Sequence, residues 1–159
     1  MTRSALMLIV FLAAAATAFA ARLDDSASPR QRFDLTPRWL NDGDSGGSSD
    51  RLNAMVAEVP NVEVRLNTAP HVGTRARIYL VLPPLVAGMR SPSGMRVEWR
   101  TRGQFLAGSA LPGDRTLLYD GPISRPLVSE IFDFVIYLDA RHMGGGLRFD
   151  PTFEIDVSP

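Results

Sequence analysis

Two aspartates and a histidine near the end of the chain are the residues best suited to acid–base or metal chemistry. Asp139 and His142 follow a strongly apolar run, and Asp150 comes shortly after a glycine triplet at 144–146. If the runs on either side of the triplet form a hairpin, the three side chains meet at its tip, where an imidazole and a carboxylate could share a proton or hold a metal ion. One His and two Asp make a thin ligand set, and a polar hairpin tip explains the same residues. The sequence therefore predicts no catalytic residue, metal or cofactor, with a hydrolase near Asp139 and His142 as an alternative.

Arginine supplies all 17 basic residues, and it is concentrated in the middle of the chain. Residues 65–115 hold eight arginines and two acidic residues, whereas the flanking segments carry an excess of acid. Such asymmetry is typical of an anion-binding surface; the alternative is that acidic strands lie beside the basic ones and neutralise them. The candidate ligand-binding residues are four arginines and two aromatic residues: Arg75, Arg77, Arg96, Arg100, Tyr79 and Trp39.

A third pattern, Gly43-Asp44-Ser45-Gly46-Gly47, resembles the pentapeptide around the nucleophile of chymotrypsin-like serine proteases. In those enzymes the histidine base precedes the serine, whereas both histidines of this chain, His71 and His142, follow it. The pentapeptide also lies in a polar, glycine-rich stretch that cannot hold a strained oxyanion site. We expect a linker here rather than a protease site.

The elements that must position these residues are strands. From residue 59 onward apolar and polar residues alternate with a period of two, which is the pattern of half-buried antiparallel strands. Proline- and glycine-rich turns separate the runs. About seven strands in roughly a hundred residues predict an all-β fold, an antiparallel β-sandwich of immunoglobulin-like or jelly-roll-like type. We expect the last two runs, 131–139 and 147–157, to pair as a hairpin, and Trp99 to lie in the core.

The first 21 residues have the features of a secretory signal peptide. Arg3 precedes an apolar run that is shorter than the ~20 residues needed to span a bilayer. Ala18-Phe19-Ala20 then supplies the small-x-small pattern of a cleavage site, so we expect cleavage after Ala20 or Ala21. This predicts a periplasmic or secreted protein with no membrane span after cleavage.

Residues 22–50 are polar and rich in Gly, Ser and Asp, which predicts a flexible linker or tail. The β-sandwich domain is expected at 51–159. It should begin with a short helix, because apolar residues recur at the helical spacing i, i+3, i+4 and i+7 behind a capping residue at 49 or 50: Leu52, Met55, Val56 and Val59.

The chain contains no cysteine, so neither a disulfide nor a lipidated cysteine can stabilise or anchor the protein. The formal net charge is zero, which disfavours nucleic acid as a partner. We expect an exported, non-enzymatic binding or accessory module of the bacterial envelope with a protein partner. Trp39 would cover a sheet edge or contact that partner. The alternative is a module that binds carbohydrate or anionic polysaccharide through its Arg-rich strand faces.

Overall fold

The computed structural model describes residues 20–29, 35–40 and 53–157 of the 159-residue chain. Within these ranges the protein is all-β, with nine strands in two antiparallel sheets and helical structure limited to three short 3-10 turns. None of the described helices has the length and hydrophobicity needed to span a membrane.

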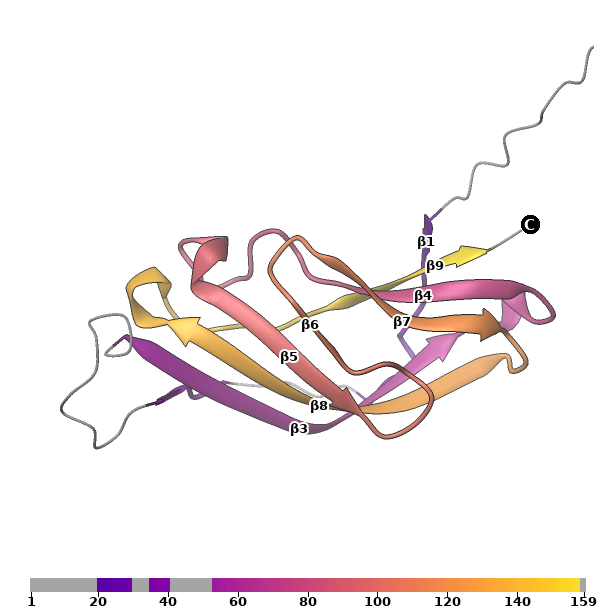
Figure 1. The fold of residues 1–159 in the computed structure, drawn as a ribbon, viewed down its shortest axis with the longest axis horizontal. Helices are drawn as coiled ribbons and strands as arrows, with labels where there is room; N and C mark the ends of the chain where they lie inside the picture. The colour runs from indigo at the N-terminus through magenta and orange to yellow at the C-terminus, as the bar shows by residue number, and fades with distance from the viewer. Residues whose placement is uncertain (1–19, 30–34, 41–52, 158–159) are drawn as a thin grey trace, which may run out of the picture.

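The strands are β1 (Ala20–Arg22), β2 (Arg38–Trp39), β3 (Ala54–Asn67), β4 (Arg75–Val81), β5 (Met95–Thr101), β6 (Gly108–Ala110), β7 (Arg115–Pro122), β8 (Leu127–Asp139) and β9 (Thr152–Val157). The 3-10 turns are η1 (Ala69–His71), η2 (Pro92–Gly94) and η3 (Ala140–His142). The four-stranded sheet has the order β1-β9-β4-β7, and the five-stranded sheet has the order β2-β3-β8-β5-β6. Figure 1 shows long β3 and β8 in one layer and β4, β7 and β9 in the other, which gives a sandwich-like fold.

Strand pairing in the two sheets is nested. β1 pairs with β9, β3 with β8, β4 with β7 and β5 with β6. Two further pairings, β4 with β9 and β5 with β8, join these pairs into the two sheets. The chain therefore runs as one long antiparallel ribbon that is rolled over on itself, and β2 is added outside it, on the free edge of β3.

The core lies between the two sheets, where the apolar rows of β8 and β9 face each other. Phe132 and Phe134 of β8 are buried, and the ring centroid of Phe132 lies 6.0 Å from that of Phe153 of β9. The expected hairpin between these strands is wrong, because β8 and β9 belong to different sheets and the connecting residues 140–151 cross from one to the other. Alternation predicts which side chains face a core, but it does not say which sheet a strand joins.

The helix expected near residues 50–59 is also wrong for the residues that the structure describes, because 54–59 form the first half of β3. The helical spacing arises from a strand with buried residues on both faces. Ala57 and Val59 belong to the core cluster, whereas Val56 is buried but lies outside it, in register with Tyr137 of β8. Pairing along the length of β8 outweighs the weak helical propensity of this segment.

Part of the segment expected to be a linker belongs to the sandwich. Leu23 is only 3% exposed and its N–H donates to the carbonyl of Phe153 at 2.8 Å. The next residue, Asp24, bridges to Asn67 at the end of β3. Residues 22–24 thus connect the two sheets along one side of the sandwich, and residues 38–39 form β2. Residues 25–29, 35–37 and 40 are described but belong to no strand. The remaining residues, 30–34 and 41–50, lie outside the described part of the chain.

The opposite side of the sandwich is closed by the chain between β5 and β6. The N–H of Leu106 donates to the carbonyl of Leu118 in the four-stranded sheet at 2.7 Å, and Gly108 pairs with Trp99 in the five-stranded sheet. Trp99 itself is buried, with its indole N–H donating to the carbonyl of Leu106 at 3.0 Å. The expectation that Trp99 is a core residue is therefore confirmed.

Candidate functional site

Two of the candidate arginines, Arg75 and Arg77, lie on the outer face of β4 and share one acidic partner. The Nε atom of Arg77 lies 2.9 Å from a carboxylate oxygen of Asp120, its cross-strand partner on β7, and Nη2 of Arg75 lies 3.6 Å from the other oxygen. The hydrogen bond from Arg77 lowers the pKa of Asp120, so the carboxylate is ionised at neutral pH. One carboxylate on β7 therefore pairs with both arginines and offsets part of their charge.

Tyr79, on the same face of β4, does not offer a free ring to a sugar. The guanidinium of Arg115 lies 3.5 Å from the centroid of the Tyr79 ring. That guanidinium is held in place by Glu154 at 2.7 Å and Asp156 at 2.6 Å, both on β9. The cation thus covers the aromatic face, and the two carboxylates balance the cation.

Arg96 and Arg100 lie on β5, in the five-stranded sheet, and so on the other layer of the sandwich. Arg96 pairs with Glu98 at 2.9 Å and lies over the Tyr137 ring, 4.6 Å from its centroid. Arg100 is exposed and is in register with Asp133. The candidate arginines therefore do not form one basic face: they are divided between two sheets, with acidic residues among them.

The Asp139, His142 and Asp150 group does not converge either. Asp139 accepts hydrogen bonds from the backbone and guanidinium of Arg141, which lower its pKa to about 2. His142 lies in η3 and packs so closely on Gly94 that a side chain at residue 94 would collide with it. Asp150 lines a separate hollow. Among the described residues, no group of three or more His, Asp or Glu is placed to hold a metal ion. The serine pentapeptide at 43–47 lies outside them.

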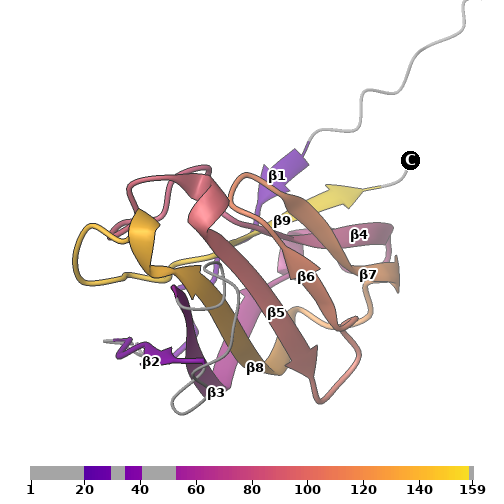
Figure 2. The ribbon, with the colours of Figure 1, turned by 60° about the vertical axis from the view of Figure 1, so that its left-hand side comes forward.

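Trp39, the sixth candidate, lies on β2 at the edge of the five-stranded sheet (Figure 2). Trp39 and Leu40 are 46% and 45% exposed. The N–H of Leu40 donates to the carbonyl of Ala54 on β3 at 2.9 Å, and Trp39 is in register with Met55. Because the N–H and C=O groups of an antiparallel strand point to alternate sides, those of Trp39 point away from β3, towards the side of β2 on which no other described strand lies.

An ion pair fixes β2 on its neighbour. Arg38 of β2 lies 2.8 Å from Glu58 of β3, and both side chains are on the outer face of the sheet. No other described strand pairs with the outer side of β2. Two successive large apolar side chains at such an edge are unusual, because proteins generally protect sheet edges with charge, proline or a covering segment. The polar context of Trp39 and Leu40 in the sequence indicated both residues, but the orientation of the edge could not be read from it.

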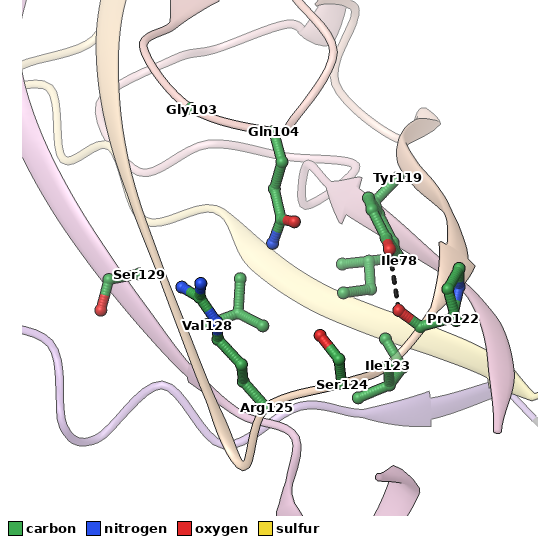
Figure 3. Close-up of a pocket in the computed structure, with 10 residues that line it drawn as sticks. All are labelled: Ile78, Gly103, Gln104, Tyr119, Pro122, Ile123, Ser124, Arg125, Val128 and Ser129. Atoms are coloured by element: carbon green, nitrogen blue, oxygen red, sulfur yellow. Dashed lines mark hydrogen bonds between the residues drawn. The ribbon is translucent and has the colours of Figure 1, made fainter. Parts of the chain in front are cut away.

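The structure also forms a pocket of about 270 Å³ that the sequence did not indicate (Figure 3). It opens at the end of the sandwich where β7 leads into β8. Its floor is apolar, and polar side chains surround its mouth: Gln104, Tyr119, Ser124 and Arg125. The loops that meet here, 102–105 and 122–126, are about twenty residues apart in the sequence and carry no recognisable motif.

No family model matches this chain, and no curated protein is detectably similar to it in sequence. What the protein does must therefore be argued from its surfaces.

Proposed function

We propose that the protein is an exported, non-enzymatic β-sandwich module that binds a protein partner in the bacterial envelope. The observation that carries this proposal is the exposed pair Trp39 and Leu40 on edge strand β2. The partner would supply an extended segment that adds to β2 as a further strand, a common way for proteins to recognise peptides at a sheet edge.

The edge offers both parts of such an interaction. The outward N–H and C=O of Trp39 can pair with the backbone of the added strand, which provides affinity with little regard to sequence. Trp39 and Leu40 project to opposite faces of the sheet, because side chains alternate along a strand. Tryptophan is one of the side chains enriched at the energetic centres of protein interfaces. A bound strand would therefore be held by its backbone and by one apolar contact on each face.

The alternative functions have less support from the described residues. Binding of an anionic polymer by the strand faces would require free guanidinium groups, and Arg75, Arg77 and Arg96 each have an acidic neighbour within 4 Å. A hydrolase at Asp139 and His142 would require acid and base groups that converge on one site. Asp150 instead lines a separate hollow, and the carboxylate of Asp139 is bonded to the guanidinium of Arg141.

For the type of sandwich we propose a jelly roll rather than an immunoglobulin-like fold. The nested pairing of β1 with β9, β3 with β8, β4 with β7 and β5 with β6 supports this choice, because it is the arrangement of a long ribbon rolled into two sheets. The fold alone does not imply a function.

Site-specific photo-crosslinking in living cells tests the binding proposal. A photoreactive phenylalanine analogue at residue 39 should give one discrete adduct with an envelope protein. The same analogue at residue 127 provides the control, because Leu127 is about as exposed but lies on β8. Equal adducts from both positions, or none from residue 39, would refute the proposal. A symmetric adduct between two copies of this chain would replace the partner with a second copy.

The export part of the proposal has its own test. The intact mass of chain recovered from the envelope fraction should correspond to a first residue of Ala21 or Arg22. Recovery of the full-length chain from the cytoplasm alone would contradict export.

A further inference from the structure

The pocket between loops 102–105 and 122–126 lies at the start of β8, whereas the edge strand β2 lies near the end of β8. Its wall includes Val128 at the start of β8, whereas β2 pairs with the part of β3 that lies opposite the end of β8. The pocket is thus separate from the β2 edge, and an inference about it does not depend on the proposed function.

The charge in the pocket has one sign. Arg125 is the single charged side chain among the ten lining residues, all of which the structure describes. Within the described part of the chain no acidic residue forms an ion pair with it, in contrast to the paired arginines of the strand faces. In Figure 3 the Arg125 guanidinium lies beside Val128, between Ser129 and Gln104 in this view. An uncompensated guanidinium at the mouth of a pocket favours an anionic group there.

The other polar groups suit a ligand that carries hydroxyls. The Gln104 amide offers a donor and an acceptor, and the Ser124 hydroxyl offers both functions in one atom. In Figure 3 both side chains point into the pocket, while the Tyr119 hydroxyl is already bonded to the carbonyl of Pro122 at 2.9 Å. The floor is formed by three buried apolar residues: Ile78, Ile123 and Val128.

Hydrogen bonds to Glu130 hold the backbone of the loop that carries Gln104. Glu130, which is buried, accepts hydrogen bonds from the backbone N–H groups of Arg102 at 3.3 Å and Phe105 at 3.0 Å. Gly103 leaves room for this carboxylate, because a Cβ at residue 103 would lie 2.6 Å from an oxygen of Glu130. The pocket therefore presents Gln104 from a fixed backbone, which reduces the entropy lost when a ligand binds.

We propose that this pocket binds a sugar acid, a single hydroxylated ring with one carboxylate, with the carboxylate on Arg125 and ring hydroxyls on Gln104 and Ser124. The guanidinium fork matches the two oxygens of a carboxylate. The cavity has a volume of about 270 Å³, which suits one ring rather than a polymer. The ligand class is related to the polysaccharide alternative from the sequence, but the site differs from the Arg-rich strand faces.

Titration of the ¹⁵N-labelled protein with galacturonate, galactose and inorganic phosphate tests this proposal. Galacturonate should produce saturable shifts of amides in 103–105 and 123–125. Galactose, which lacks the carboxylate, and phosphate, which lacks the ring, should each bind at least about tenfold more weakly, because each loses charge-assisted or ring contacts. No saturable shift with galacturonate, or equal binding of either control ligand, would overturn the assignment.

Two matched variants remove one positive charge each. Arg125→Gln should weaken galacturonate binding at least about tenfold, whereas Arg148→Gln, at an exposed arginine in the connection between β8 and β9 that does not line the pocket, should leave it unchanged. Arg125→Lys keeps the charge but cannot form the paired hydrogen bonds of a guanidinium, so it should also bind more weakly than the unmodified protein. An equal loss in the Arg148 and Arg125 variants would show a general charge effect and refute the site. Unchanged spectra outside the pocket check that each variant is folded.

Discussion

The carboxylate of Glu130 accepts a hydrogen bond of 3.0 Å from the backbone N–H of Phe105, which ties the loop between β5 and β6 to β8. Glu130 occupies an inward position of β8 between the buried residues Val128 and Phe132, and it is only 4% exposed. Its oxygens also accept from the N–H groups of Arg102 and Ile131. A charged group is thus accommodated in a core row because three backbone donors surround it.

Glu130→Ala should lower the free energy of unfolding by about 2–4 kcal/mol, because the buried N–H of Phe105 loses its acceptor and a cavity is left. Urea denaturation followed by circular dichroism measures the change. Glu98→Ala is the matched control, since Glu98 is half-exposed and forms a surface ion pair with Arg96, worth less than about 1 kcal/mol. Equal effects of the two substitutions would contradict the role of Glu130 in holding the loop.

Leu23→Ala should destabilise the protein by about 2–5 kcal/mol, as expected for a fully buried leucine. The same substitution at Leu127, which is 43% exposed, should cost less than about 1 kcal/mol. Thermal unfolding of the two variants side by side provides the measurement. If Leu23→Ala were as mild as Leu127→Ala, residues 22–24 would be a linker and not part of the sandwich.

Trp99→Ala should cost about 3–5 kcal/mol, because it removes a large buried aromatic ring and leaves the carbonyl of Leu106 without its indole donor. Trp39→Ala should cost less than about 1 kcal/mol, since the side chain is half-exposed at an edge. Chemical denaturation distinguishes the two tryptophans. A large loss of stability at residue 39 would indicate that this ring supports the fold and is not free for a partner.

The carboxyl group of Asp139 should titrate near pH 2, because the hydrogen bonds from Arg141 favour its ionised form. A pKa lowered in the folded state means that the ionised carboxylate stabilises the fold above about pH 4, and that this stabilisation is lost as the pH falls towards 2. Carboxyl-carbon NMR measures the pKa directly, and Arg141→Gln should raise it towards the ordinary aspartate value. A pKa of Asp139 at or above the ordinary aspartate value would contradict its hydrogen bonding to Arg141.

The sequence predicted the all-β class and the buried position of Trp99, because strict alternation depends only on neighbouring residues. It could not predict the sheet that each strand joins, so β8 and β9 were expected to pair although they face each other across the core. Short elements were also missed. β1 and β2 have three and two residues, and Leu23 is a lone apolar residue in a polar stretch.

The candidate sites depended on contacts between distant residues. The arginines at 75 and 77 share the carboxylate of Asp120, which is more than forty residues away along the chain but adjacent on the next strand. Arg125 gave no signal, because its neighbours in the pocket come from loops separated in the sequence. Residue type alone therefore indicated charge, but only the strand register shows which charges are free.

Binding measurements on three proteins test most directly the central claim that the open backbone edge at Trp39 is the binding surface. The partner is the protein trapped by crosslinking at residue 39, and the chains are the unmodified protein, Trp39→Ala and Trp39→Pro. Loss of the indole in the alanine variant should weaken binding by about 1–3 kcal/mol. Proline also removes the outward N–H without touching the bond from Leu40 to Ala54, and should weaken binding by about 1 kcal/mol more. Unchanged affinity in the alanine variant, or equal affinity of the alanine and proline variants, would contradict strand addition at β2.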